Sequence, residues 1–332
     1  MHRVFYWAAL CLGAVGFAAS ESFAHHSRAN FSDATVVIRG EVTRVEWKNP
    51  HVYFFVREET ADGAVDWQVE GQSTPGLLRR GWTPDALKPG DRVTLRGNPD
   101  RNSARRLIFP EFVTKTDGTT LRVQGPVLQT GDTSARATGI AGMWSAVGAP
   151  FDRSRPATHL PLTAKGRAAA ARFDVRNDPF ADCIPPQVPD SLSTPYLHEI
   201  IVRDDVVLLR EEYWEVERVV YMDGREHPAG SPRTNQGHSI GYWEGSTLVV
   251  DTTLFDDHRF GNGSGIPSGA QKHIVERYSL DTDGRTLTIS YVLTDPEFLA
   301  EPVEGSRSWR HTPGLEFLPN RCDLETARRY VD

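Results

Sequence analysis

The chain has few cysteines, no cluster of basic residues and no repeated unit. Cysteine occurs three times in 332 residues, and 44 acidic side chains outnumber 37 basic ones, for a formal net charge of −7. An acidic balance without a basic run argues against nucleic acid as a partner. The sequence shows no low-complexity stretch and no short-period repeat. The chain is long enough for about two domains.

The only long apolar run lies at the N-terminus, from Val4 to Ala19. Small residues at Ser22 and Ala24 suit signal-peptidase cleavage, so residues 1–24 are predicted to be a signal peptide. The run is too short to anchor the chain stably in a membrane. We therefore expect a periplasmic or secreted protein without stable membrane insertion.

Removal of the signal peptide leaves two cysteines, Cys183 and Cys322. An even pair in an exported chain predicts a disulfide. In the chain-entropy model such a long closed loop stabilises the folded state by about 4 kcal/mol. The alternative is two free buried thiols.

The predicted fold class is mainly β, because 28 glycines and 22 prolines indicate many turns. Residues 25–125 contain five short β-rich runs, with a short helix between the third and the fourth. Ser73 or Thr74 is placed to cap this helix. Five strands with this helix are the order of an OB-like five-stranded barrel, although another barrel topology is compatible. Residues 126–139 are small and polar and are predicted to be a linker.

Residues 140–332 are predicted to form a lipocalin-like antiparallel up-and-down barrel. Asp-Asp, Asp-Gly and Glu-Gly pairs separate eight or nine consecutive β-rich runs without crossover helices. A barrel of this size has room for one small ligand. The expected strands are 198–203, 206–212, 215–222, 238–243, 247–254, 272–280, 285–294 and 306–311, after a first strand around Trp144.

Two motif sets resemble uncharacterised bacterial families. Ala24-His25-His26-Ser27, followed by Asn49-Pro50-His51, is similar to a family of exported domains, over roughly residues 24–125. The second half resembles another family without known activity. This resemblance rests on Met222-Asp223-Gly224, His227-Pro228, the hairpin at 237–252, Glu276-Arg277-Tyr278 and Asp295-Pro296. The resemblances imply export and two domains, and they imply no reaction.

Three histidines form a candidate metal site. If cleavage follows Ala24, the free amino group and the imidazole of His25 can chelate one ion. Imidazoles from His26 and His51 would complete a nitrogen-rich site that suits copper or zinc. The alternative is a solvated N-terminus with a structural His51 beside a turn.

The hairpin at residues 237–252 carries the candidate catalytic pair. A two-residue loop at Glu244-Gly245 places His238 opposite Asp251. A carboxylate on one imidazole nitrogen raises the basicity of the other, which suits a general base. Ser239 points to the opposite face and is a poor nucleophile partner. The alternatives are a pair that contacts a ligand and a polar pair that holds the hairpin register.

Polar residues in otherwise apolar strands are the candidate ligand contacts. Glu276 and Tyr278 share one face of their strand, and Arg277 takes the other. Glu211, Glu212, Glu215 and Glu217 are predicted to form a solvated face. The predicted ligand-binding set is Tyr242, Glu276, Tyr278 and His273.

Three functions follow as hypotheses. The first is a periplasmic protein that binds a small apolar molecule in the C-terminal barrel. The second is an acid-base enzyme, an isomerase or lyase, with His238 as base and Asp251 as orienting group. The third is copper or zinc binding through the N-terminal histidines.

Overall fold

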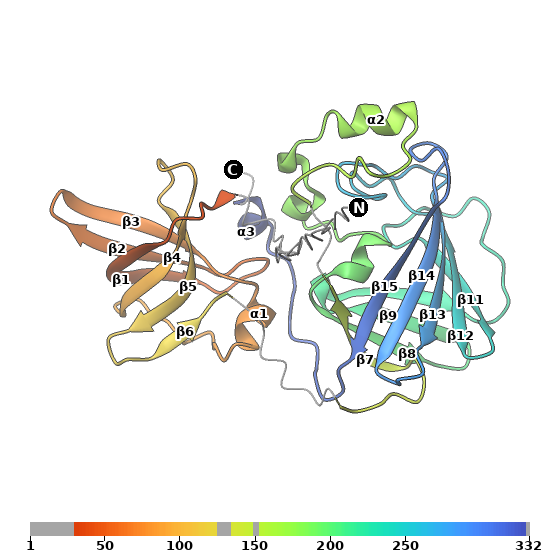
Figure 1. The fold of residues 1–332 in the computed structure, drawn as a ribbon, viewed down its shortest axis with the longest axis horizontal. Coiled ribbons are helices and arrows are strands. Elements are labelled where there is room, and N and C mark those ends of the chain that lie inside the picture. The colour runs from red at the N-terminus through yellow and green to blue at the C-terminus, as the bar shows by residue number, and fades with distance from the viewer. Residues whose placement is uncertain (1–29, 125–133, 149–152, 330–332) are drawn as a thin grey trace, which may run out of the picture.

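The computed structural model describes residues 30–124, 134–148 and 153–329. The described chain is mainly β and folds into two barrels that lie side by side (Figure 1). The strands are β1 (Val36–Glu46), β2 (Tyr53–Thr60), β3 (Gly63–Glu70), β4 (Arg92–Pro99), β5 (Leu107–Lys115), β6 (Thr120–Arg122), β7 (Gly142–Val147), β8 (Leu197–Val202), β9 (Val206–Glu211), β10 (Val216–Tyr221), β11 (His238–Glu244), β12 (Thr247–Thr253), β13 (His273–Leu280), β14 (Thr286–Thr294) and β15 (Val303–His311). The helices are α1 (Thr74–Leu78), α2 (Ala164–Ala170) and α3 (Leu324–Arg328), with 3-10 turns η2 (Val175–Asn177), η3 (Pro179–Asp182), η4 (Asp190–Ser193) and η5 (Tyr213–Glu215). Within these ranges, none of the helices combines the length and the apolar character that crossing a membrane requires.

The first barrel has the strand order β3-β2-β1-β4-β5, and a parallel pairing of β3 with β5 closes it. The helix α1 follows β3, where the sequence predicts it. The Ser73 hydroxyl accepts a hydrogen bond from the Gly76 amide (3.3 Å), and Pro75 occupies the first turn. These features confirm the predicted OB-like five-stranded barrel.

The second barrel has nine strands in the closed order β7 to β15. All neighbouring pairs are antiparallel except β10 and β11, which run parallel. A closed ring with an odd number of strands needs one parallel pair. The chain supplies it with a long connection, residues 222–237, after which Ser239 of β11 pairs with Val220 near the end of β10. The predicted antiparallel barrel is therefore confirmed, with one parallel seam.

Side chains fill the interior of this barrel. Trp144 and Tyr278 are fully buried, and Trp309 is 3% exposed. The Trp309 indole donates a hydrogen bond to the Leu192 carbonyl (2.8 Å), which ties the segment around η4 to the barrel. A ligand between these strands would have to displace packed side chains. Binding of a small apolar molecule there stays an untested prediction, and the packing does not favour it.

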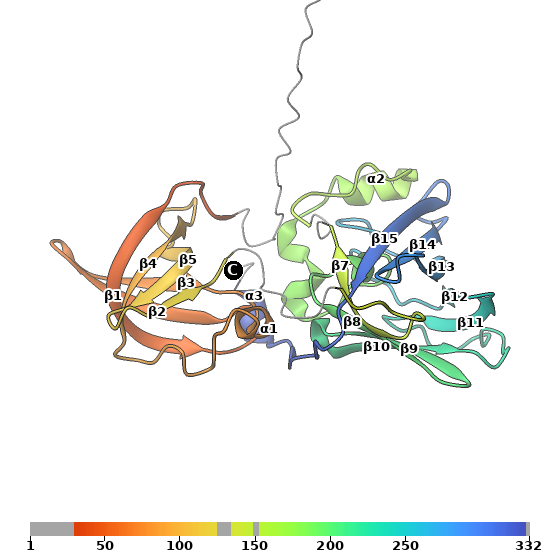
Figure 2. The ribbon, with the colours of Figure 1, turned by 60° about the horizontal axis from the view of Figure 1, so that its bottom comes forward.

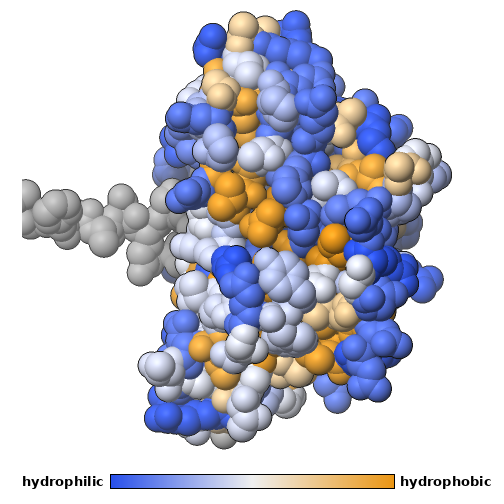
Figure 3. All heavy atoms as spheres, turned by 90° about the vertical axis from the view of Figure 1, so that its right-hand side faces the viewer, coloured by the Kyte–Doolittle hydropathy of each residue, from blue (hydrophilic) through white to orange (hydrophobic). Residues whose placement is uncertain are grey.

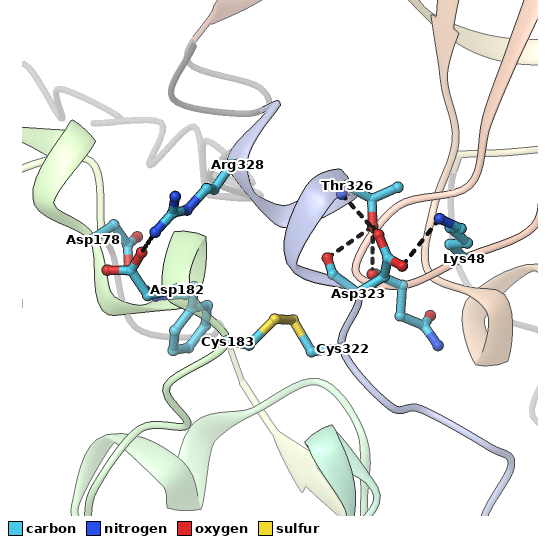
Figure 4. The surroundings of a disulfide bond; sticks show 10 residues. Lys48, Asp178, Asp182, Cys183, Cys322, Asp323, Thr326 and Arg328 are labelled. Carbon is cyan, nitrogen blue, oxygen red and sulfur yellow. Dashed lines mark hydrogen bonds and ion pairs between the residues drawn. A yellow bond between two sulfur atoms is a disulfide. The ribbon is translucent and has the colours of Figure 1, made fainter.

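The C-terminal segment joins the two barrels. After β15 the chain runs back, and α3 lies between the barrels (Figures 1 and 2). Cys183 and Cys322 form the predicted disulfide, with their Cα atoms 5.7 Å apart (Figure 4). Thr326 donates a hydrogen bond to the Asn49 carbonyl (2.7 Å), and Lys48 pairs with Asp323 (3.1 Å). The disulfide therefore holds a strap that also contacts the first barrel.

The acidic run after β9 is not the solvated face that its sequence predicts. Glu212 is 0% exposed, and its carboxylate accepts a hydrogen bond from Arg79 of the first barrel (2.8 Å). The carboxyl group of Glu211 is buried inside the second barrel. Glu215 and Glu217 are exposed as predicted. The alternation of these glutamates with apolar residues did not reveal that the segment packs between two barrels.

Candidate functional site

The hairpin of β11 and β12 positions the site, in a register that differs from the predicted one. Glu244 pairs with Thr247, so the two-residue loop is Gly245-Ser246. Gly245 has φ +61°, and a turn with glycine at its first central position requires this positive φ. The predicted Glu244-Gly245 loop is wrong. His238 consequently pairs with Thr253, and Asp251 lies diagonally from it on the same outer face.

Four polar side chains meet on this outer face. Asp251 of β12 accepts a hydrogen bond at Oδ1 from Nε2 of His273 on β13 (2.8 Å). The same oxygen accepts a hydrogen bond from Nε2 of His227 (3.1 Å). The Nδ1 atoms of His227 and His238 lie 2.9 Å apart. We call His227, His238, Asp251 and His273 the histidine cluster.

The connection between β10 and β11 brings His227 to the cluster. This segment, residues 222–237, follows β10 and brings His227 into contact with His238 and Asp251 on the outer face. His227 therefore stands between His238 and Asp251, and the predicted direct contact of these two residues is replaced by a bridge. Tyr221 stacks on the His238 ring, with centroids 5.2 Å apart and planes at 23°. The guanidinium of Arg225 lies 3.8 Å from the centroid of the Tyr221 ring.

Hydrogen bonds define the proton positions in the cluster. Because the Asp251 carboxylate only accepts, Nε2 carries a proton in both His227 and His273. A neutral His227 then has a lone pair at Nδ1 and accepts from Nδ1–H of His238. This leaves Nε2 of His238 unprotonated. When His227 is charged, the proton lies on its own Nδ1, and Nε2 of His238 becomes the protonated atom. Uptake of a proton at Nε2 of His238, together with transfer of its Nδ1 proton to His227, thus switches Nε2 of His238 from acceptor to donor.

The environment shifts the pKa values of the two outer imidazoles in opposite directions. Burial lowers the pKa of His238, and the charges of His227 and Arg225 act the same way. The hydrogen bond with Asp251 raises the pKa of His273. Burial alone would raise the pKa of Asp251, but the hydrogen bonds and charges of the two imidazoles lower it. The ionised carboxylate of Asp251 therefore lies beside the imidazole of His273, which favours the charged form. The imidazole of His238, which favours the neutral form, belongs to the same cluster.

The opposite face of the same strands carries a buried polar network. Arg218 makes two hydrogen bonds with the Glu276 carboxylate (2.5 and 2.8 Å), and it donates to the Tyr278 hydroxyl (3.1 Å). Tyr278 in turn donates to Glu276 (2.7 Å). Glu276 and Tyr278 are 0% exposed, and Arg218 is 6% exposed. We call Arg218, Glu276 and Tyr278 the buried network.

Ser239 belongs to this inner face and not to the histidine cluster. Residues 237–241, Gly-His-Ser-Ile-Gly, have the Gly-x-Ser-x-Gly spacing of hydrolase nucleophile elbows. Here the motif enters a strand, and an elbow needs a strand-to-helix turn. The Ser239 side chain is 1% exposed and hydrogen-bonds the Thr252 hydroxyl (2.8 Å). The spacing therefore carries no nucleophile.

The predicted ligand contacts do not come together. Glu276 and Tyr278 point into the barrel, where they bond each other and Arg218. His273 lies on the outer face, and so does Tyr242, which is 53% exposed. The strands β11 and β12 lie on the right-hand side of the molecule in Figure 1, and Figure 3 shows the molecule from that side. Hydrophobic residues gather in the middle of this face, and hydrophilic residues surround them.

Of the predicted metal site, His25 and His26 lie outside the described residues. His51 follows the first barrel's Asn49-Pro50 turn, and its Nδ1 donates a hydrogen bond to the Gly71 carbonyl (3.1 Å). This contact places the proton on Nδ1 and leaves a lone pair on Nε2. Within the described ranges, no group of three or more His, Cys, Asp or Glu side chains is arranged to hold a metal ion.

His227 is the cluster residue that the sequence did not reveal. In the sequence, His227-Pro228 is typical of a turn. Its distance from strands β11 and β12 depends on how the long connection between β10 and β11 folds. The parallel pairing of β10 with β11 determines the position of His227. The sequence pattern of nine similar strands does not indicate which two strands form the parallel pair.

Comparison with known proteins identifies only part of the chain. Residues 14–108 match a family of unknown function (DUF6152), which covers most of the OB-like barrel. This match agrees with the resemblance of the first half to an uncharacterised domain. No curated protein matches the chain. The histidine cluster lies outside the matched residues.

Proposed function

We propose that the protein is an acid-base enzyme that uses the histidine cluster to move a proton between two positions of its substrate. The observation that carries this proposal is that His238 and His273 lie near one carboxylate and have pKa values shifted in opposite directions. Two titratable groups whose environments separate their pKa values are suited to the roles of base and acid.

In this proposal His238 is the base and His273 is the acid. Nε2 of His238 takes a proton from the substrate, and the ring passes its Nδ1 proton to His227 through the 2.9 Å contact. Asp251 holds His227 and His273 by their Nε2 protons and stabilises the positive charge that develops on either ring. In this scheme Nδ1–H of charged His273 delivers a proton to the product. The reaction classes that need both steps are isomerisation and elimination.

The substrate would bind on the outer wall of the barrel. The side chains of His227, Asp251 and His273 retain 22%, 34% and 39% of their exposure, so they are reachable from solvent. The half-buried Ile240 and Val275 share this outer face with the cluster. The ring of Tyr221 stacks on His238. These residues offer an apolar surface beside the proton-transfer groups.

Deuterium incorporation tests the proposal before the substrate is known. Metal-free protein is incubated in D2O with a panel of 2-oxo acids, hydroxy acids and unsaturated acids, and substrate C–H signals are followed by NMR. An enzyme that removes a proton exchanges it with solvent. We expect exchange in one class, with at least a hundredfold loss in His238→Gln. Unchanged exchange in His238→Gln or Asp251→Asn would refute the roles assigned here. Ser239→Ala, on the inner face, is the matched control.

We propose copper or zinc binding at His51 as a second function. The specific support is the hydrogen bond from Nδ1 to the Gly71 carbonyl, which leaves Nε2 as the ligating atom. The proposal also requires export and cleavage after Ala24, because the chelating amino group belongs to His25.

Intact mass and bound-metal analysis of protein purified from the periplasm test this second function. We expect His25 as the first residue and about one copper or zinc ion per chain. His51→Ala should lose the metal, and His273→Ala should retain it. A different first residue, or equal metal content in the two variants, would contradict this site.

A further inference from the structure

A buried lysine and a buried glutamine contact each other where the segment before η4 meets the residue that precedes β13. Both side chains, Lys272 and Gln187, are 1% exposed. Nζ of Lys272 donates a hydrogen bond to Oε1 of Gln187 (3.0 Å), and it also donates to the carbonyl oxygens of Val188 (2.7 Å) and Gly261. The ring centroid of Phe255, which is 0% exposed, lies 4.6 Å from Nζ. The amine is therefore enclosed by protein and touches the primary amide of a glutamine.

Within the described part of the chain, no carboxylate accepts a hydrogen bond from the Lys272 amine. Its three acceptors are neutral carbonyl oxygens, although a buried charge is normally paired with an opposite one. Burial lowers the pKa of Lys272 to about 7, and the charges of Asp190, Asp295 and Glu276 oppose this effect only in part. A substantial fraction of the side chain is therefore an unprotonated amine at neutral pH, and an unprotonated amine is a nucleophile.

Asp256 holds the Gln187 amide on its other side. Nε2 of Gln187 donates hydrogen bonds to the backbone carbonyl oxygen and to Oδ1 of Asp256, both at 3.1 Å. Burial raises the pKa of Asp256, and the contact with Gln187 opposes this effect. A carboxyl group therefore lies at the nitrogen atom that must leave when this amide exchanges its amine, and a carboxyl group can carry the proton that the leaving nitrogen needs.

We propose that Lys272 and Gln187 join in an intramolecular isopeptide bond and that Asp256 transfers the proton. Nζ attacks Cδ of Gln187, so that a bond from Nζ to Cδ forms and the bond from Nε2 to Cδ breaks. The proton that Nζ loses passes to the Asp256 carboxylate, which returns it to Nε2. Ammonia leaves, and one amide replaces another, so the reaction needs no oxidant, reductant or co-reactant.

Enclosure of the two side chains favours this reaction. The contact holds the amine against the amide, so the step is intramolecular and requires no further loss of translational freedom. Exclusion of water removes the competing hydrolysis of the intermediate. The new bond would join segments 85 residues apart in the sequence and would tie the segment before η4 to the start of β13. This cross-link is independent of the proton-transfer function proposed above.

Peptide mapping of the full mature chain tests the proposal. The purified native protein is reduced, alkylated and digested with trypsin, and the peptides are identified by tandem mass spectrometry. Trypsin does not cut after an acylated lysine, so we expect one branched product in which residues 177–203 are joined to residues 260–277. Its mass should be lower than the sum of the two linear peptides by one molecule of ammonia.

Two results of the mapping would overturn the proposal. The first is recovery of residues 177–203 and 260–272 as separate, unmodified peptides. The second is loss of ammonia within a separate peptide at Asn262-Gly263, because an Asn-Gly pair that cyclises to a succinimide loses the same mass without a cross-link. The mapping of the native protein needs no substitution, so it decides the case even if a variant fails to fold.

Two lysine variants locate the bond. Lys272→Arg keeps a cation but removes the amine, so it should yield the separate peptides. Lys48→Arg, at an exposed lysine that pairs with Asp323 (3.1 Å), is the matched control and should retain the branched product. A branched product in Lys272→Arg would contradict the assignment of the nucleophile.

Two neighbouring aspartates test the proton transfer. The rate is measured on protein refolded from urea-dissolved inclusion bodies, by sampling the amount of branched product over time. Asp256→Asn should slow bond formation at least about a hundredfold, the size expected for loss of a general acid-base group. Asp257→Asn, at an exposed carboxylate that pairs with Arg233 (2.6 Å), should leave the rate unchanged. Equal rates in the two variants would overturn the role of Asp256.

Discussion

The two faces of β11, β12 and β13 carry polar groups of opposite character. On the inner face, Arg218 of the neighbouring strand β10 and Glu276 are almost fully buried, and hydrogen bonds join them to each other and to Tyr278. On the outer face, three imidazoles and Asp251 are partly exposed and share protons across contacts of 2.8 to 3.1 Å. Residues one position apart in the sequence thus lie on opposite faces of the sheet, one buried and the other partly exposed.

Because the two faces differ in burial, the inner polar groups affect the stability of the barrel, and the outer polar groups are available for proton transfer. A buried ion pair is costly to break, because removal of one partner leaves an uncompensated charge in a low-dielectric interior. Exposed groups contribute little to stability, because water and salt screen their charges. Imidazoles on the outer face can therefore change protonation without unfolding the barrel. Substitutions on the inner face should change stability, and those on the outer face should change pKa values.

The largest effect is expected for Glu276→Gln in the buried network. The substitution leaves the Arg218 guanidinium buried without its counter-ion, so we expect the free energy of unfolding to fall by about 3–5 kcal/mol. Urea denaturation measures this change. The double variant Arg218→Met/Glu276→Leu removes both charges and should recover part of the loss. A decrease below about 1 kcal/mol in the single variant, the size typical of an exposed pair, would show that the pair is not a buried one in solution.

Glu211→Gln should have an effect on stability that depends on pH. Burial raises the pKa of Glu211 from 4.5 to about 8, so the folded state holds a proton that the unfolded state releases between these values. The stability that this group contributes is present below pH 4.5 and is lost as the pH rises through about 8. The Gln variant cannot titrate, so its stability relative to the native protein should increase by about 1.4 kcal/mol per pH unit in this window. Urea denaturation at pH 5, 6.5 and 8 measures the difference, and a constant difference would contradict the prediction.

Asp251→Asn should change pKa values more than stability. Without the carboxylate, the pKa of His273 should fall toward its ordinary value of 6.5. The stability from this pair is present where both partners are charged, above the lowered pKa of Asp251 and below the raised pKa of His273. It is lost as the pH falls through the first value or rises through the second. NMR titration of the His273 ring measures the shift. An unchanged His273 pKa in the variant would mean that the hydrogen bond with Asp251 does not form.

Glu244→Gln should have the smallest effect and is the control for the buried network. Glu244 pairs with Arg277 on the outer face of the same hairpin region, and the two side chains are 45% and 42% exposed. We expect the free energy of unfolding to change by less than about 1 kcal/mol. Urea denaturation under the conditions used for Glu276→Gln measures it. An effect as large as that of the buried pair would remove the distinction between the two faces.

Local patterns predicted the strands and the two barrels, because strand alternation, turn pairs and the cap at Ser73 are short-range signals. They also placed His238 and Asp251 on one face. The register failed, since Glu244-Gly245 and Gly245-Ser246 are both acceptable two-residue loops and tertiary pairing chooses between them. His227 and Glu212 were missed for a related reason. The position of His227 depends on the path of a long connection, and the burial of Glu212 depends on packing between the two barrels.

The most direct test of the account is an NMR titration of the histidine ring protons in the native protein, with assignments from His238→Gln and His273→Gln. The account predicts a pKa below 6.5 for His238 and above 6.5 for His273, because burial disfavours charge on the first ring and Asp251 favours it on the second. Two values at 6.5, or the reverse order, would contradict the assignment of His238 as base and His273 as acid.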